Sequence, residues 1–268
     1  MKLAWLTDIH INFLDQDERI QFYQKIIRKK CDAVLISGDI AEGNSVVDLL
    51  MEMADVIQKP IYFVLGNHDY YFSSVANIIK DMTQLTKTHS GLHWLNISGI
   101  QMLNENTILL GQDGWADGRL GDYQNSRVVL NDSRLIAELF QQKMLGKNQL
   151  LQKMQSLADT DAKNLKLDLL KAITHKPRKI IILTHVPPFK EACLYQGKIS
   201  GDDWLPFFGS KATGDVLLEI AQQNVNIEFL VLCGHTHGKA CYSPLNNLMV
   251  KAGGAEYYRP KIQEAIEI

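Results

Sequence analysis

Cysteine is scarce in this sequence, with four residues among 268 and no CxxC pair. So few cysteines in a chain of this length argue against a disulfide framework, and the sequence predicts reduced, mostly buried thiols in a cytoplasmic protein. Long apolar runs are missing as well, since no stretch reaches the roughly 18 residues that a membrane helix needs. The apolar stretch near the N-terminus covers only 3–6 and ends before Asp8, which is too short for a signal peptide.

A surplus of basic residues is also absent: Lys and Arg total 28, Asp and Glu total 30, and the formal net charge is −2. This balance argues against a binder of extended nucleic acid, which would normally need a basic surplus or stripe. The rest of the composition, with 46% apolar and 22% charged residues, is that of an ordinary globular protein. The length alone predicts one large domain or two small ones.

The first 66 residues alternate between short apolar runs and amphipathic segments. Apolar runs at 2–7, 33–37 and 61–65 are predicted strands, and segments 17–30 and 45–57 have apolar residues at helical spacing. The strands are continuously apolar rather than alternating, which is typical of a parallel sheet covered on both faces. The sequence therefore predicts an α/β fold.

Beyond residue 90 the pattern changes, with a loop at 112–131 and a strongly helical stretch at 132–174 that is broken near Gly146. The other predicted elements are short strands within 93–110, strands at 179–184 and 228–233, a helix at 211–223, and closing strands at 248–250 and 261–268. The connection at 186–210 is long for a compact domain, and loops of that length are usually functional.

Polar residues of metal-binding or acid–base type follow each of the main apolar strands. In chain order they are Asp8-Ile9-His10, Gly38-Asp39, Gly66-Asn67-His68-Asp69, His185 and Gly234-His235-Thr236-His237. Because ligands bind outside the carboxyl ends of strands in open α/β sheets, we expect these residues to converge on one edge of the sheet. Five of the eight histidines fall at these positions, whereas His89, His93 and His175 are expected to be ordinary surface or core residues.

This mixture of Asp oxygens, an Asn carbonyl and His nitrogens is a ligand set for first-row transition metals such as Mn, Fe or Zn. Mg or Ca alone would usually recruit oxygen ligands. Seven candidate ligands are too many for one ion and suit two ions that share a bridging carboxylate, an arrangement that can stabilise in-line displacement at phosphorus. Gly38, Gly66 and Gly234 stand beside the ligands, where we expect tight turns.

Taken together, the five blocks span 8–237 and resemble the calcineurin-like metallophosphoesterase superfamily. The resemblance implies a four-layer α-β-β-α sandwich of two mixed sheets with a dinuclear metal site at one edge. Both halves of the ligand set are needed for one site, so we expect 1–268 to form a single domain. The helical stretch 132–174 is then an insertion or cap within that domain.

The resemblance also implies a role for each motif residue. The implied metal ligands are Asp8, His10 and His237 for one ion, Asn67, His185 and His235 for the other, and Asp39 as the bridge between them. His68 would contact the phosphate and assist the leaving oxygen, and Asp69 would orient the His68 ring. The nucleophile would be a metal-bridging hydroxide that attacks in line, without a covalent intermediate.

The motif blocks are weak guides to the substrate. They resemble those of bacterial class III cyclic-nucleotide phosphodiesterases, but the same blocks occur in monoesterases. Trp115 and Trp204 are candidates to stack on a base or aryl group, and Arg119 is a candidate to bind a second phosphate. The alternative is that these aromatic residues anchor the long loops 112–127 and 187–211 and that the arginine is solvated.

The sequence thus predicts a dinuclear metal-dependent hydrolase of a small phosphomonoester or phosphodiester, nucleotides included, with no membrane partner and no extended nucleic acid. Its oligomeric state stays open. One alternative is a non-catalytic protein-binding scaffold on the same fold, which would be expected to lose ligands or His68. Another is a one-metal hydrolase of a non-phosphate ester, which would need only three protein ligands.

Overall fold

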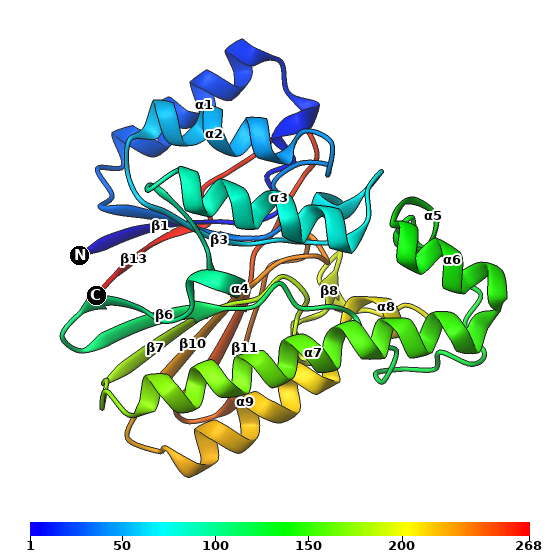
Figure 1. Cartoon of the computed structure of the whole chain (residues 1–268). Coiled ribbons are helices and arrows are strands. Elements are labelled where there is room, and N and C mark those ends of the chain that lie inside the picture. The colour runs from blue at the N-terminus through cyan, green and yellow to red at the C-terminus, as the bar shows by residue number, and fades with distance from the viewer.

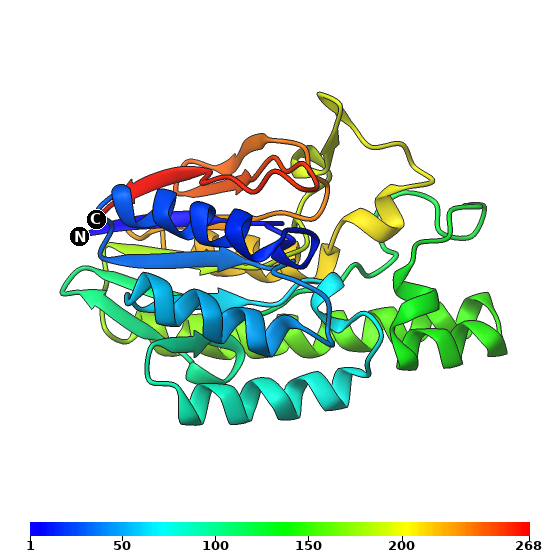
Figure 2. The same ribbon diagram turned by 90° about the horizontal axis from the view of Figure 1, so that it is seen from above.

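The computed structural model describes every residue from 1 to 268, and its two β-sheets pack face to face between two layers of helices (Figure 1). The four-layer α-β-β-α sandwich that the sequence predicts is therefore confirmed. The two termini lie side by side at one end of the sandwich (Figure 2), where the N-terminal amino group donates to the carbonyl of Ile268 at 2.7 Å.

The first sheet has the strand order β13-β1-β2-β3-β4. Its strands are β1 (Lys2–Leu6), β2 (Ala33–Ser37), β3 (Ile61–Val64), β4 (Leu92–Trp94) and β13 (Glu264–Glu267). Strands β1 to β4 are parallel, as their apolar runs predict, and β13 pairs antiparallel with β1 at the edge. The helices on its outer face are α1 (Gln16–Arg28), α2 (Val46–Ile57) and α3 (Val75–Thr88).

The second sheet has the order β11-β12-β10-β7-β6-β5. Its strands are β5 (Gln101–Asn104), β6 (Thr107–Gly111), β7 (Lys179–Leu183), β10 (Glu228–Cys233), β11 (Ala240–Leu245) and β12 (Leu248–Ala252). The four central strands are parallel, and β5 and β11 are antiparallel edges. The sequence does not predict β11, because it is half exposed and contains Pro244, which is tolerated at a sheet edge.

Two long helices cover the outer face of the second sheet, and the remaining elements are short. Those two are α7 (Lys147–Ile173) and α9 (Lys211–Gln223). The short helices are α4 (Leu95–Ser98), α5 (Asp132–Leu135), α6 (Ala137–Leu145), α8 (Leu205–Phe208), η1 (Ile11–Phe13), η2 (His68–Tyr70) and η3 (Lys190–Ala192), and a small hairpin pairs β8 (Leu194–Tyr195) with β9 (Lys198–Ile199). None of the helices combines the length and apolar character that crossing a bilayer would require.

The helical stretch 132–174 divides into two parts. Helices α5 and α6 project beyond the sheets (Figure 2), but α7 runs back along the second sheet. Leu150 and Met154 on α7 belong to the core of the first sheet, and Leu165 and Leu169 belong to the core of the second. The apolar side of α7 covers the sandwich, and the prediction that 132–174 is an insertion or cap within the domain stays a prediction. A helix that packs on both cores supports a single domain.

Three apolar clusters hold the layers together. Twelve buried residues lie between the sheets, among them Trp5, Leu35 and Leu232. A cluster of 38 packs helices against the first sheet, and a cluster of 19 packs helices against the second. Because both faces of each sheet are covered, the central strands stay apolar along their length, and functional side chains are found where the strands end.

Candidate active site

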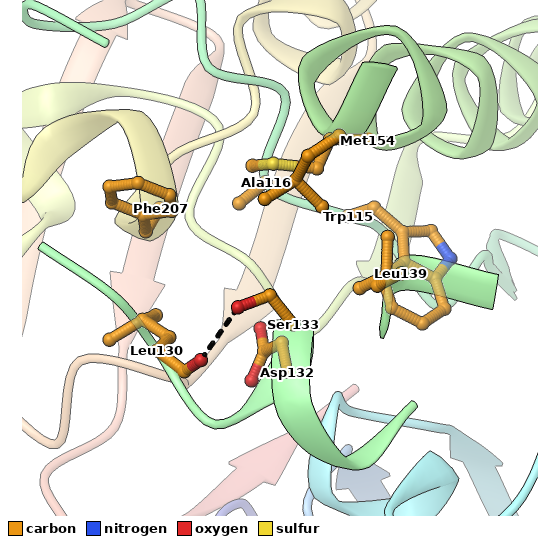
Figure 3. Close-up of a pocket in the computed structure, with 9 residues that line it drawn as sticks. Trp115, Ala116, Leu130, Asp132, Ser133, Leu139, Met154 and Phe207 are labelled. Carbon is orange, nitrogen blue, oxygen red and sulfur yellow. Dashed lines mark hydrogen bonds between the residues drawn. The ribbon is translucent and has the colours of Figure 1, made fainter. Parts of the chain in front are cut away.

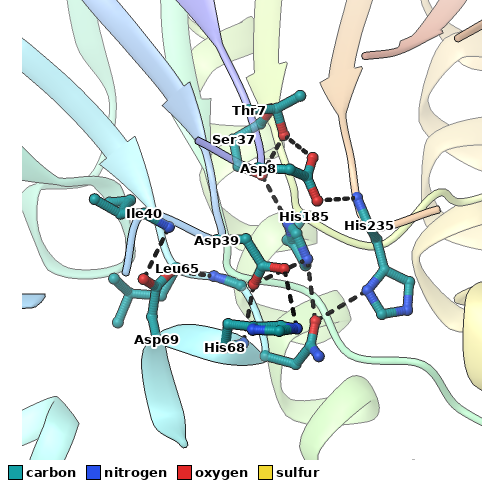
Figure 4. A network of polar contacts seen from close by, with 12 residues as sticks. Thr7, Asp8, Ser37, Asp39, Ile40, Leu65, His68, Asp69, His185 and His235 are labelled. Carbon is teal, nitrogen blue, oxygen red and sulfur yellow. Dashed lines mark hydrogen bonds and ion pairs between the residues drawn. The ribbon is translucent and has the colours of Figure 1, made fainter. Parts of the chain in front are cut away.

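Five strand ends meet at one end of the sandwich and bring all seven predicted ligands together. The first sheet supplies Asp8 and His10 after β1, Asp39 after β2 and Asn67 after β3, whereas the second supplies His185 after β7 and His235 and His237 after β10. The ligands therefore come from two facing sheets, and the expectation that they share the edge of one sheet is wrong. The carboxyl ends of both sets of parallel strands point the same way, which explains why sequence reasoning merged them (Figure 4).

The backbone at these strand ends is strained. The ligands with a left-handed backbone are Asp8, His10, Asp39, His235 and His237, with φ between 41° and 71°. Each non-glycine residue in this region costs on the order of 1–3 kcal/mol, so neighbouring structure must hold it. Asp8 donates its N–H to the carbonyl of Gly38 at 3.0 Å, and His10 donates to the carbonyl of Asp39 at 3.1 Å. The two strand ends thus fix each other.

The three glycines beside the ligands serve two different purposes. Gly38 has φ of +90°, so it occupies a turn as predicted. Gly66 and Gly234 have no such conformation. A Cβ at Gly66 would collide with the Asp39 carboxylate, and a Cβ at Gly234 would collide with that of Asp8. For these two, the reason for glycine is the close approach of a ligand rather than a tight turn.

One cluster of ligands contains Asp8, His10, Asp39 and His237, whose ligand atoms all lie within 4.8 Å of one another. The two Nε2 atoms of His10 and His237 face each other at 3.4 Å. His237 Nε2 lies 3.4 Å from Asp8 Oδ1, and His10 Nε2 lies 3.7 Å from Asp39 Oδ2. Asp8 Oδ2 is turned away and accepts from the Thr7 hydroxyl at 2.7 Å.

A second cluster lies on the other side of Asp39. Asp39 Oδ1 is 3.3 Å from His185 Nε2, which is also 3.1 Å from Asn67 Oδ1. His235 Nδ1 approaches the same amide oxygen at 2.9 Å. Asp39 therefore presents one oxygen to each cluster, which is the geometry that a bridging carboxylate requires.

The donor chemistry of the second cluster calls for a cation. His185 Nδ1 lies 2.9 Å from the carbonyl of Ser37 and His235 Nε2 lies 2.9 Å from the carbonyl of Phe207, so each of these nitrogens carries the ring proton. Burial lowers the pKa of His235, so its ring is neutral and Nδ1 directs a lone pair at Asn67 Oδ1. His185 Nε2 lies between Asn67 Oδ1 and Asp39 Oδ1, and these two oxygens favour a cation on that nitrogen. A metal ion fits this set of donors, because it can take the place of the proton on His185 and accept the lone pair of His235.

Electrostatics in the site lead to the same conclusion. Burial alone would lower the pKa of His185, but the Asp39 carboxylate outweighs burial and raises it to about 10. Burial would raise the pKa of Asp39, yet the surrounding histidines, His185 above all, hold it well below its usual range. Burial lowers the pKa of His10 to about 4 and also lowers that of His235, so both rings are neutral. The site thus favours positive charge at His185 beside Asp39, whereas Asp8 raises the pKa of His237 against the effect of burial.

His68 lies at the edge of this site rather than within a cluster. Its Nε2 is 4.0 Å from Asp39 Oδ2, and its backbone N–H donates to Asp39 Oδ1 at 2.9 Å. The ring packs 4.2 Å from that of Tyr71, centroid to centroid, and lines a cavity of about 280 Å³ that opens over the ligands. His68 therefore borders the cavity, and its contact with a phosphate stays a prediction.

The predicted role of Asp69 is wrong. Its carboxylate accepts three backbone N–H groups, from Ile40 at 2.9 Å, Ala41 at 2.8 Å and Gly66 at 2.8 Å, and it does not contact the ring of His68 (Figure 4). Burial, with Asp39 nearby, raises the pKa of Asp69, and these donors oppose the rise. Asp69 is fully buried, and its bonds to these backbone N–H groups link the turn after β2 to the turn after β3. Its carboxylate therefore holds the backbone of the site rather than the ring of His68.

Sequence reasoning missed Asp132, Tyr71 and Tyr257. Asp132 Oδ1 accepts from the Tyr71 hydroxyl at 2.6 Å and from the Asn67 amide at 2.8 Å, which directs Asn67 Oδ1 into the second cluster. The Tyr257 ring lies 4.7 Å from that of His10 and covers the first cluster. No motif marks these residues, because they follow loops and a short helix rather than a main strand.

Asp132 should therefore support the second cluster without binding metal itself. We expect Asp132→Ala to leave the Asn67 amide held by the Tyr71 hydroxyl alone and to weaken binding of the metal ion in the second cluster by about 10- to 100-fold, as loss of a ligand's supporting hydrogen bond does. Titration of metal-free protein, followed by calorimetry, measures this. Asp203→Ala, an exposed acid, is the matched control. Equal affinities in both variants would contradict the role.

The structure does not bring Trp115 to the site. Trp115 is buried, its ring lies 4.9 Å from that of Tyr70, and it lines a small apolar cavity together with Leu139 and Met154 (Figure 3). The prediction that it stacks on substrate is wrong, because the loop after β6 turns into the core instead of over the ligands.

The other two candidate substrate residues differ in outcome. Arg119 pairs with Asp117 at 3.1 Å and Asp159 at 2.7 Å and does not line the cavity over the ligands, so its predicted role in phosphate binding is wrong. Trp204 is partly exposed and lines a hollow next to that cavity, so its role stays a prediction.

Behind the site lies a pair of buried carboxyl groups that bind nothing in the cavity. Asp113 accepts from Leu65 N, Trp94 Nε1 and the Tyr70 hydroxyl at 2.6–2.9 Å. Asp161, on α7, accepts only from the N–H of Gly114, at 2.9 Å. Burial raises the pKa of Asp161 to about 8, and Asp113 adds to the rise.

This pKa predicts a pH dependence of stability. Below the unfolded-state pKa, near 4, Asp161 is protonated in both states; between there and about pH 8 the unfolded chain alone releases the proton, so stability falls as pH rises. We expect Asp161→Asn to reduce this loss of unfolding free energy between pH 5 and pH 8 by on the order of a few kcal/mol. Thermal unfolding of wild type and variant at pH 5 and pH 8 checks it, with exposed Glu105→Gln as control. Parallel pH profiles would refute the assignment.

Fold and site together define an α/β sandwich whose candidate metal ligands come from five strand ends. A sequence profile described as calcineurin-like phosphoesterase matches residues 1–239. The chain therefore belongs to the calcineurin-like phosphoesterase family, whose members are typically dimetal phosphoester hydrolases. No curated protein matches the sequence significantly.

Solved structures share the fold at low sequence identity. A dimetal phosphatase from Danio rerio is 13% identical over 95% of this chain and 87% of that one, with a TM-score of 0.59. A phosphopantetheinyl hydrolase from Mycobacterium tuberculosis is 12% identical over 94% and 89%, with a TM-score of 0.61. A purple acid phosphatase from yellow lupin is 11% identical over 94% of this chain and 43% of that one, with a TM-score of 0.52. These likenesses concern the fold alone.

Proposed function

We propose that this protein hydrolyses small phosphomonoesters or phosphodiesters with two transition-metal ions. The observation that carries the proposal is Asp39, which presents one carboxylate oxygen to each of two clusters of lone-pair donors at the base of one cavity. Seven protein ligands exceed the three that a one-metal hydrolase needs. Nothing observed favours a non-catalytic scaffold, since all the ligands and His68 are in place.

The residues that would hold the ions follow from the two clusters. Asp8, His10 and His237 would hold one ion, Asn67, His185 and His235 the other, and Asp39 both. When bound, Mn, Fe or Zn would supply Lewis acidity toward a phosphoryl oxygen and would lower the pKa of a water molecule.

The chain's own residues position the substrate and handle protons. His68 borders the cavity with Nε2 beside Asp39, so its ring is placed to give a proton to the oxygen that leaves phosphorus. Hydrolysis then breaks one P–O bond, adds water to phosphorus and releases an alcohol. The ring of Tyr71 packs on that of His68 and the ring of Tyr257 on that of His10, so both imidazoles are held in place.

The proposal also covers the class of substrate and the cellular compartment of the protein. The substrate is a small phosphoester, nucleotides included, rather than extended nucleic acid or a membrane lipid, and the 280 Å³ cavity supports a small ligand. The cysteines Cys31, Cys193, Cys233 and Cys241 are all free thiols, which supports the reducing environment of the cytoplasm.

Removal of metal tests the proposal. We expect chelation to abolish hydrolysis of p-nitrophenyl phosphate or bis(p-nitrophenyl) phosphate and to lower Tm, because bound ions stabilise only the folded state. Mn²⁺ should restore both. The assay should accompany a count of metal ions per chain. Hydrolysis that survives complete removal of metal, or a fully loaded protein that cleaves no phosphoester in a broad panel, would overturn the proposal.

A further inference from the structure

A second hollow adjoins the cavity over the ligands. It has a volume of about 450 Å³ and is lined by Tyr195, Ile199, Ser200, Gly201, Trp204 and Phe208. Two of these residues, Tyr195 and Phe208, also line the 280 Å³ cavity that holds His68. The two hollows therefore adjoin at Tyr195 and Phe208, and a group attached to a phosphate over the ligands would lie beside the second one.

The walls of this hollow are aromatic, and water reaches them. Tyr195 is 57% exposed and Trp204 is 42% exposed, whereas most large apolar side chains of the chain are buried. The Trp204 and Phe208 rings lie 5.4 Å apart with 32° between their planes. Aromatic rings pair best with other rings in offset or tilted stacks, so these walls suit a planar group.

The charges that line the two hollows indicate which substituents of a substrate they can accept. No lysine or arginine lines either hollow, and Asp132 contributes a negative group to the first. A second phosphate or a carboxylate on the substrate would therefore find no cation in the second hollow. The hollow suits an uncharged group that is attached to a single phosphate.

Contacts between helix α8 and His235 fix the position of the second hollow relative to the ligands. Helix α8 carries Phe207, whose carbonyl accepts from His235 Nε2 at 2.9 Å, and Phe208, whose ring meets that of His235 edge-on at 5.6 Å. The same short helix that orients a ligand of the second cluster thus provides a wall of the hollow.

We infer that the hollow is a subsite for the uncharged planar aromatic group of a phosphoester substrate, with Trp204, Tyr195 and Phe208 as its walls. This inference rests on the proposed function, because it places the phosphate over the metal ligands. Aryl groups and nucleobases share this chemistry.

Benzyl, cyclohexylmethyl and ethyl phosphate test the inference, since all three release a primary alcohol and differ in the group that would enter the hollow. With metal-loaded full-length protein, we expect kcat/KM to be highest for benzyl phosphate. Trp204→Ala should lower the ratio of benzyl to ethyl kcat/KM by about 5- to 100-fold, the range of losses on removing one stacking side chain. Trp204→Phe should restore much of it. Phe140→Ala, an exposed aromatic on α6, is the control and should leave the ratio unchanged.

Binding gives a readout that does not need turnover. Benzylphosphonate and ethylphosphonate, which are not hydrolysed, should differ in Kd by a similar factor, and Trp204→Ala should reduce that difference. If Trp204→Ala fails to fold, Tyr195→Ala takes its place, since Tyr195 is the more exposed wall. A nucleoside monophosphate with a higher kcat/KM than benzyl phosphate would identify the aromatic group as a nucleobase.

The outcomes separate this inference from the proposed function. If the loaded protein cleaves no phosphoester and binds no phosphonate, the proposed function fails. If it cleaves ethyl and benzyl phosphate equally well, or if Trp204→Ala leaves their ratio unchanged, the subsite is overturned and the function stands. If cyclohexylmethyl phosphate equals benzyl phosphate, the hollow is not selective for planar rings and the inference is equally overturned.

Discussion

Replacing His68 with alanine is expected to lower kcat by about 10²- to 10⁴-fold, the usual contribution of a positioned general acid. Both metal ions should stay bound, because His68 directs no ring nitrogen into either cluster: its Nε2 stays 4.0 Å from Asp39, and its ring only packs edge-on against that of His10, with centroids 4.6 Å apart. Only its backbone N–H bonds to Asp39, and alanine keeps that group. The variant therefore separates catalysis from assembly of the site.

The size of the loss should depend on the leaving group. p-Nitrophenolate leaves without help from an acid, whereas an alkoxide needs a proton, so the loss should be larger for benzyl phosphate than for p-nitrophenyl phosphate. Steady-state rates and metal content per chain measure both effects, and His175→Ala, an exposed histidine, is the control. An unchanged rate would support a non-catalytic scaffold. Loss of metal together with activity would make His68 part of the ligand set.

The gathering of the seven candidate ligands could be predicted because each of them follows a continuously apolar strand. Asp8 after β1 and His185 after β7 are found by the same rule, although they come from different sheets. This rule predicts only that the residues lie at the carboxyl ends of the strands. It cannot tell that two sheets face each other there, because the pairing of β6 with β7 depends on contacts far apart in the sequence.

The supporting residues could not be predicted in the same way. Asp69 stands next to His68 in the chain, yet its side chain points to backbone N–H groups across the turn. Asp132 reaches the site only because the segment after β6 returns to it, and Trp115 on the same segment turns into the core. The direction of a side chain in an irregular segment depends on its neighbours in space, which no periodicity records.

Asp39→Asn is expected to have the largest effect on the metal site itself. Asp39 offers Oδ2 to His10 and Oδ1 to His185, so the amide removes a negative charge that both clusters share. Loss of one partner from a buried charged set costs about 3–5 kcal/mol. We therefore expect metal affinity to fall by about 10²- to 10³-fold and hydrolysis to fall further, since activity needs both ions together.

Calorimetric titration of the metal-free variant measures the affinity, and the rise in Tm on adding metal gives a second, independent value. Asp161→Asn is the matched control, because it makes the same exchange of carboxyl for amide at a largely buried position that lies outside both clusters. The control should bind two ions and keep its activity. If Asp39→Asn bound both ions as tightly as wild type, Asp39 would not bridge the clusters. If it lost one ion alone, Asp39 would belong to one cluster only, and the two sites would have to be assigned separately.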